Sequence, residues 1–100
     1  SPEGFTYKYD KEIEINDDDF SKLLKAAFIY ALPRHTYVVG DTINFIKTYK
    51  DKLMPEDKDY MLTRIRDRCK RFEGEDETDS FHAFDLHDVE QWRKFEEELK

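Results

Sequence analysis

The spacing of apolar positions changes once along the chain. From Phe5 to Ile15, apolar side chains alternate with mostly polar ones, which is the two-residue period of a half-buried β-strand or of a hairpin that turns near Asp10. From Phe20 onward, apolar residues recur at intervals of three and four, as on one face of a helix. The pattern predicts a mostly α protein of the α+β class. It has about four helices and an N-terminal β-strand or hairpin.

Local signals set the expected limits of the first helix, residues 18 to 32. Asn16 is a capping residue, and the three aspartates that follow it place negative charge where the free N–H groups of a helix favour it. Pro33 ends the helix, because the residue before a proline is pushed out of the α conformation.

The second helix has two alternative starting points. Thr36 is a capping residue, and Val39, Ile43 and Ile46 mark one apolar face of the helix that would follow. A glycine at position 40 weakens the first turns, so that a later start at Asp41 is the alternative.

The third helix is the best-marked element. Pro55 suits its first position, and basic residues lie in its last turn. Its apolar stripe comprises Leu62, Ile65, Cys69 and Phe72.

The C-terminal part divides into three pieces. The run EGEDETDS, residues 73–80, is typical of a solvated loop. FHAFDL, residues 81–86, is interpreted as a short extended piece that pairs with the N-terminal strand, and Asp85 opens a last helix, 85–100.

The length of 100 residues suits one domain. We expect that domain to comprise an acidic β-type N-terminus (1–17), a helical core (18–73), the acidic loop and the C-terminal helix. No stretch reaches the roughly 20 apolar residues of a membrane span, and the first residues lack the features of a signal peptide. The single cysteine, Cys69, excludes an internal disulfide. We therefore expect a cytoplasmic protein.

Charge is unevenly distributed around the net value of −7. Residues 1–19 and 73–100 are strongly acidic, whereas residues 20–72 are basic. Either the acidic ends fold back on the basic middle and neutralise it, or they remain available to a partner. The candidate partner-binding acids are Glu12, Glu14, Asp17, Asp18, Asp19, Glu73, Glu75, Asp76, Glu77 and Asp79.

The strongest basic run is RIRDRCKR, residues 64–71. On a helical wheel its charges divide between the two flanks of the apolar stripe, so a solvated, ion-paired helix face is favoured over a phosphate-binding patch. The alternative phosphate-binding set is Arg64 and Arg68 with Arg71 on one flank, and Arg66 with Lys70 on the other.

Catalytic and metal chemistry find little support in the sequence. His82, Asp85, His87 and Asp88 are metal-ligating types, but their spacing does not place two histidines on one helix face. Cys69 falls on an apolar stripe, where a buried and inert thiol is expected. We therefore expect no enzyme activity, no cofactor and no metal.

The stretch YALPRHTYVVGD, residues 30–41, is interpreted as a structural corner between two helices rather than an active site. Its corner residues are Pro33, Arg34, Thr36 and Tyr37. Asp41 and Asp67 are the leading candidates for a carboxylate partner of the arginine.

The same stretch, extended to YALPRHTYVVGDTINFI and taken with IRDR and a C-terminal tryptophan, resembles uncharacterised small proteins of prophages and mobile elements in Gram-positive bacteria. Their pattern is Tyr-Ala-Leu-Gly-Arg-Arg-Thr-Tyr, an aliphatic helix, a helix with Arg-Asp, and then a Trp; about half the chain follows it. Pro33 and His35 depart from it. The resemblance implies a phage-type context and no assigned activity. The matching residues are Tyr30, Ala31, Leu32, Arg34, Thr36, Tyr37, Asp67 and Trp92.

Two functional hypotheses follow. The first is a small, acidic, non-enzymatic phage or mobile-element protein, a monomer or homodimer, that binds and modulates or inhibits a host protein such as a defence nuclease, in the manner of an anti-CRISPR protein or a nucleic-acid mimic. The alternative is an accessory nucleic-acid-binding or regulatory protein that uses the basic helix 56–72. Neither hypothesis involves a membrane.

Overall fold

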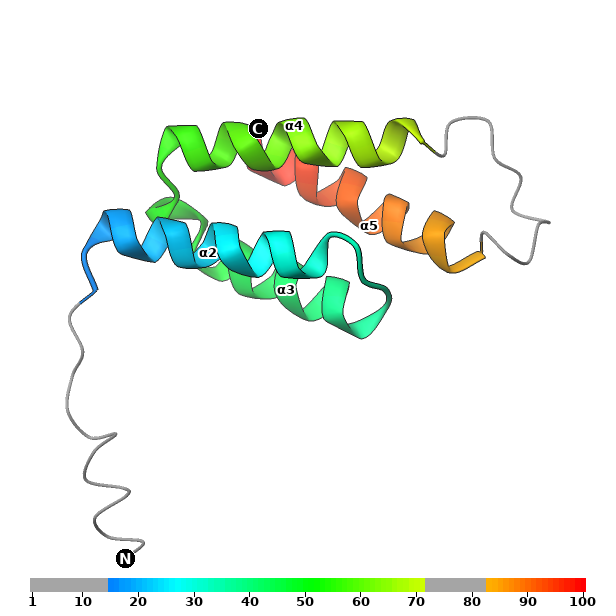
Figure 1. Ribbon diagram of the computed structural model, residues 1–100, viewed down its shortest axis with the longest axis horizontal. Coiled ribbons are helices and arrows are strands. Elements are labelled where there is room, and N and C mark those ends of the chain that lie inside the picture. Colours follow the sequence, from blue (N-terminus) through cyan, green and yellow to red (C-terminus); the bar gives the residue numbers. More distant parts are fainter. Residues whose placement is uncertain (1–14, 72–82) are drawn as a thin grey trace, which may run out of the picture.

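The computed structural model describes residues 15–71 and 83–100, and this part of the chain is helical (Figure 1). The predicted mostly helical architecture is confirmed. The predicted N-terminal strand and the acidic loop 73–80 lie outside the described residues. The described elements are α2 (Asp17–Ala31), α3 (Tyr37–Thr48), the short 3-10 helix η1 (Lys50–Lys52), α4 (Pro55–Lys70) and α5 (Ala83–Leu99).

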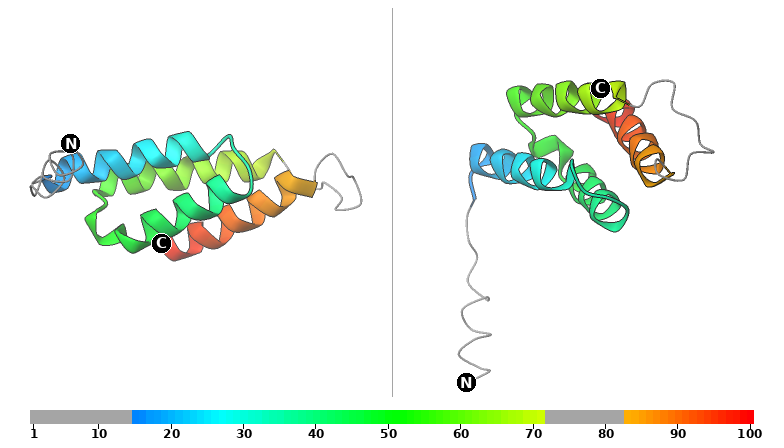
Figure 2. Two further views of the ribbon diagram at one scale, coloured as in Figure 1. Left: turned by 90° about the horizontal axis from the view of Figure 1, so that it is seen from below. Right: turned by 45° about the vertical axis from the view of Figure 1, so that its right-hand side comes forward.

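The four α-helices form two antiparallel hairpins that pack on each other, α2 with α3 and α4 with α5 (Figures 1 and 2). Between the hairpins, α2 packs on α4 and α3 packs on α5. Helices in these contacts run in the same direction, because the chain crosses from the end of α3 to the start of α4 through η1 (Figure 1).

Both ends of α2 follow from local sequence. The side chain of Asn16 accepts a hydrogen bond of 2.9 Å from the backbone N–H of Asp19, which satisfies one of the free donors at the helix N-terminus. The helix ends at Ala31, with Leu32 as its C-cap and Pro33 directly after. The cap and the stop that the sequence predicts are confirmed.

The start of α3 differs from both alternatives in detail. Thr36 occupies the N-cap position, but its side chain makes no capping hydrogen bond and its φ is 50°. The later start at Asp41 is wrong, because the N–H of Gly40 already bonds to the Thr36 carbonyl at 3.0 Å and closes the first turn. The predicted apolar face of Val39, Ile43 and Ile46 is buried.

Helix α4 confirms the stripe predicted for it. Pro55 takes the first turn, and Leu62, Ile65 and Cys69 are buried. The last member of that stripe, Phe72, lies outside the described residues.

Helix α5 begins earlier than predicted, at Ala83 instead of Asp85. The extended piece predicted for residues 81–86 is therefore wrong from position 83 onward. The buried residues Asp88, Val89 and Trp92 lie at helical spacing. Residues 83–86, which come just before them, therefore belong to the same helix instead of forming a strand.

Aromatic side chains fill the space between the two hairpins. Trp92 is fully buried, and its ring centroid lies 5.3 Å from that of Phe28 on α2 and 6.1 Å from that of Phe95 on α5. Edge-to-face and tilted rings at these distances add to the stabilisation from burial. Among the described residues, no helix combines the length and the apolar content needed to cross a bilayer.

Candidate interaction surfaces

Asp57, in the first turn of α4, is a buried carboxylate that joins α4 to α2. Its side chain is 1% exposed. It accepts hydrogen bonds of 2.6 Å from both the Ser21 hydroxyl and the Lys22 ammonium. The Ser21 Oγ in turn accepts a 2.8 Å hydrogen bond from the N–H of Met54, just before α4. This network fixes the start of α4 against the start of α2.

Opposing effects set the acidity of this carboxylate. Burial raises the pKa of Asp57. The hydrogen bonds from Lys22 and Ser21, together with the charges of Lys22 and Lys25, lower the pKa by more than burial raises it, so that the net pKa is below the usual aspartate value. The hydrogen bond to Asp57 raises the pKa of Lys22. The pair is therefore ionised at neutral pH and holds the fold together.

Asp88 forms the corresponding link at the other end of the bundle. This fully buried residue of α5 accepts a 3.0 Å hydrogen bond from the N–H of Thr36, and its second oxygen lies 2.6 Å from Nδ1 of His35. The corner between α2 and α3 is thus held by a carboxylate from α5. The prediction that this stretch is a structural corner has a physical basis in this contact.

Arg34, at the same corner, does not contact the predicted carboxylates. Its guanidinium lies over the Tyr30 ring, 3.6 Å from the centroid, and donates a hydrogen bond to the Tyr30 carbonyl. Asp67 instead pairs with Arg64 at 3.7 Å. The predicted pairing of Arg34 is wrong because the cation finds a π face and a carbonyl within its own turn. Tyr37 is exposed beside it.

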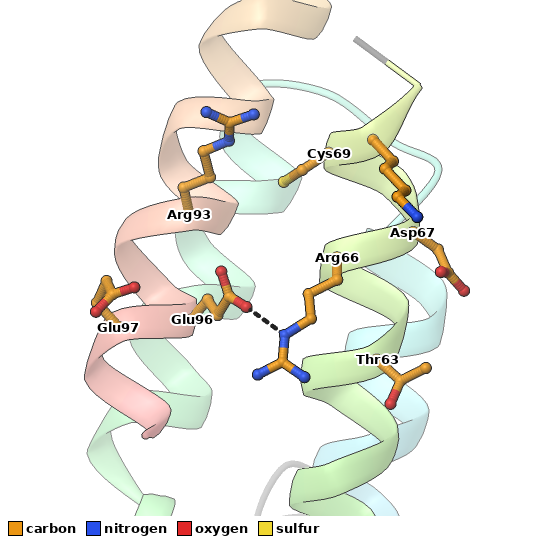
Figure 3. A pocket seen from close by; sticks show the side chains of 8 residues that line it. Thr63, Arg66, Asp67, Cys69, Arg93, Glu96 and Glu97 are labelled. Atoms are coloured by element: carbon orange, nitrogen blue, oxygen red, sulfur yellow. Dashed lines mark hydrogen bonds and ion pairs between the residues drawn. The ribbon is translucent and has the colours of Figure 1, made fainter. Parts of the chain in front are cut away.

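The basic residues of α4 are divided between two grooves, as the helical wheel predicts. Arg66 and Lys70 line a hollow of about 690 Å³ between α4 and α5, and there Arg66 donates a 2.8 Å hydrogen bond to Glu96 (Figure 3). Arg64, Arg68 and Arg71 line a second groove between α4 and the end of α2. The basic residues of the two grooves therefore do not form one continuous basic patch.

Cys69 lies in the wall of the first groove, and its side chain is directed toward α5 (Figure 3). Burial raises the pKa of its thiol, and the nearby Arg93 guanidinium opposes this only in part. Because a protonated thiol is a poor nucleophile, the geometry agrees with the expected inert cysteine.

Only part of the candidate acidic surface can be placed. Asp17, Asp18 and Asp19 are exposed in the first turn of α2, where Asp17 lies 3.6 Å from Lys52. Within the described ranges, no group of three or more potential metal ligands is close enough to hold an ion. Seven of the predicted acids lie outside the described residues: Glu12, Glu14, Glu73, Glu75, Asp76, Glu77 and Asp79.

An exposed apolar surface, which we call the aromatic face, lies where α2 and α3 meet. It consists of the partly buried Phe20 and of Leu23 from α2, of Phe45 from α3, and of Tyr49, the residue directly after α3. The Tyr49 ring is 5.1 Å from that of Phe20 and 5.5 Å from that of Phe45. Leu23, Phe45 and Tyr49 are 48%, 38% and 40% exposed. The sequence places Phe45 and Tyr49 beside the apolar stripe of α3, but it does not show that no other helix covers them.

The two buried aspartates were missed as well, although the sequence holds a signal for them. Asp88 precedes the buried Trp92 and Phe95 by four and seven residues, so it lies on the apolar stripe of α5. Asp57 precedes Met61 on α4 in the same way. A carboxylate on a core stripe predicts a buried and hydrogen-bonded acid.

Comparison of the chain with protein-family models, with curated proteins and with solved structures gives no match. The resemblance to prophage proteins therefore stays a prediction.

Proposed function

We propose that this protein is a non-enzymatic binding module that engages another protein through the aromatic face. The observation that carries the proposal is the exposure of Leu23, Phe45 and Tyr49 at the junction of two helices. Clustered apolar side chains on a surface mark protein–protein interaction sites, and aromatic residues are enriched at the centres of such interfaces.

Charge next to the aromatic face supports the same function. Asp19 precedes Leu23 by four residues on α2, so the exposed acids of the first turn adjoin the apolar side chains. An apolar centre with a charged rim is the usual composition of a protein interface, in which the rim steers the approach of a partner of opposite charge.

The partner that we propose is a host protein, in the setting of a phage or mobile element. The acidic residues favour a basic partner, and enzymes that act on nucleic acid, such as defence nucleases, present basic surfaces. The module would inhibit such an enzyme by occupying its nucleic-acid-binding surface.

Nucleic-acid binding by α4 is less well supported. Arg66 is hydrogen-bonded to Glu96, Arg64 is paired with Asp67, and the basic side chains face two different grooves. A phosphate backbone is best bound by cations along one continuous surface.

A capture experiment from host lysate tests the proposal. We expect the tagged protein to retain a stoichiometric partner that carries a basic surface, and the double variant Leu23→Ser plus Phe45→Ser to lose it. Tyr37→Ser removes an even more exposed aromatic side chain outside the face, and we expect this control to retain the partner.

Two results would contradict the proposal. One is retention of the partner by the double variant while its circular dichroism matches that of the wild type. The other is tight, salt-sensitive binding of DNA or RNA that the double charge reversal Arg64→Glu plus Arg68→Glu abolishes, since this would establish the nucleic-acid alternative.

A further inference from the structure

A second surface, which we call the arginine groove, lies between the end of α2 and the last turns of α4. Ile29, Leu32 and Pro33 come from the α2 side, and Tyr60 comes from α4. Arg64, Arg68 and Arg71 line the same groove from α4. The groove is thus apolar on one side and cationic on the other.

The apolar side is open to an anchoring side chain. Ile29 is 47% exposed, and Pro33 is also exposed. Both lie close in sequence to the fully buried core residues Phe28 and Ala31. Burial of one aliphatic side chain on this surface would favour association, because it removes apolar area from water. The α2 side of the groove therefore offers an anchor site for one apolar residue.

Among the described residues that line the groove, the arginines outnumber the acids. Asp67 is the acid among them, and it lies 3.7 Å from Arg64. One further cation lies beside the groove: the Lys25 ammonium is 4.4 Å from the centre of the Tyr60 ring and 3.9 Å from Asp57. In a chain of net charge −7, this local excess of positive charge favours an anionic ligand.

We propose that the arginine groove binds an acidic peptide segment of a partner protein, with one apolar side chain of the segment on Ile29 and Pro33 and its carboxylates on the arginines. Arginine forks bind carboxylates in a bidentate manner, and the apolar anchor fixes the register of the segment. The inference concerns a surface other than the aromatic face and does not depend on it.

The side chains that line the arginine groove favour a peptide over nucleic acid. Single-stranded nucleic acid binds proteins through bases stacked on exposed aromatic rings. Tyr60 is the aromatic residue among the described residues that line the groove. The Lys25 ammonium lies over its ring, which also packs edge-to-face with the Phe28 ring at 6.4 Å between centroids. Ile29 and Pro33 present aliphatic, not aromatic, surface.

Fluorescence anisotropy with a labelled synthetic peptide of glutamate and leucine, added to the full chain at low salt, tests this inference. We expect binding that weakens as salt increases. Ile29→Ser and Arg71→Glu should each raise Kd by roughly tenfold. Ile15→Ser, which matches Ile29→Ser in side chain and exposure, and Lys94→Glu on α5 should leave Kd unchanged.

Three results would overturn the inference. The first is that the full chain fails to bind the peptide. The second is that a peptide of glutamate alone binds equally well, and the third is that a DNA or RNA oligonucleotide binds more tightly and displaces the peptide. Melting curves of Ile29→Ser and Arg71→Glu that match the wild type ensure that a loss of binding reports on the groove and not on the fold.

Discussion

Asp57 and Asp88 are the buried acids among the side chains that the structure describes. Asp57 takes hydrogen bonds from α2, and Asp88 takes one from the corner between α2 and α3. A buried carboxylate stabilises a fold only when its donors are present, because desolvation of the charge is costly. Ser21 and Lys22 supply this compensation for Asp57.

Asp57→Ala should lower the free energy of unfolding by about 2–3 kcal/mol, since it removes two charge-assisted hydrogen bonds and leaves the buried Ser21 hydroxyl without its acceptor. Urea denaturation measures the change. Asp59→Ala replaces an exposed acid of the same helix turn and should change the stability by less than about 0.5 kcal/mol. Equal effects of the two variants would contradict the structural role of Asp57.

The lowered pKa of Asp57 predicts a specific dependence on pH. The pKa in the folded state is below that in the unfolded state, so the ionised carboxylate contributes its full stability above the usual aspartate pKa of about 4 and loses it as pH falls through the folded pKa. The stability difference between wild type and Asp57→Asn should therefore shrink on acidification below about pH 4. Urea titrations across this range measure the difference, and a constant difference would refute the assignment.

Cys69 should react slowly with a thiol reagent in the folded protein, because burial raises its pKa and restricts access. Because the buried thiol reacts only when the structure opens, addition of denaturant should increase the rate of alkylation by at least about 100-fold. Mass spectrometry follows the modification, with Cys69→Ser as the unreactive control. Equal rates in buffer and in denaturant would show that the thiol is accessible.

The ends of the helices were predicted well where the signal is local. Asn16, Pro33 and Pro55 act on the backbone within one turn of their own positions, so the sequence alone reveals the cap, the stop and the first turn. Thr36 was assigned the right place but the wrong role. Its side chain makes no capping hydrogen bond, and its own N–H instead donates to Asp88, which lies 52 positions further along the chain.

Thr36→Gly should stabilise the corner between α2 and α3. A threonine with φ of 50° is strained, whereas glycine adopts positive φ without steric cost, and the Thr36 side chain makes no capping hydrogen bond. We expect a gain of about 0.5–1 kcal/mol in thermal or urea unfolding, after allowance for the greater freedom of glycine in the unfolded chain. Thr42→Gly within α3 is the matched control and should destabilise by about 0.3–0.5 kcal/mol. Loss of stability in Thr36→Gly would show that the threonine is not strained.

The packing of the two hairpins could not be predicted, and the reason is physical. Periodicity identifies the apolar stripe of each helix, but it does not say which stripe faces which. It places Ile43 and Ile46 on the buried face, but it does not say whether another helix covers Phe45 and Tyr49, which remain exposed. The candidate surfaces depend on this difference, so they required the structure.

Unfolding of the whole chain should be a single cooperative transition, as expected for one domain. Trp92 is the only tryptophan and contacts residues from both hairpins, so its fluorescence reports on the interface between them. Its transition in urea should coincide with that of far-UV circular dichroism. Separate midpoints would mean that one hairpin unfolds before the other. The buried aromatic variant Phe28→Leu should lower both midpoints together.

The positions of Asp57 and Asp88 have a consequence for how the halves of the molecule recognise each other. The two carboxylates of the second hairpin meet their donors on the first near opposite ends of the bundle (Figure 1). A displacement of one hairpin along the other by a single helical turn, about 5.4 Å, would keep apolar surfaces in contact. It would also leave both carboxylates buried without their hydrogen-bond donors. Mismatched pairings are thereby penalised twice, so the two hairpins acquire a unique alignment.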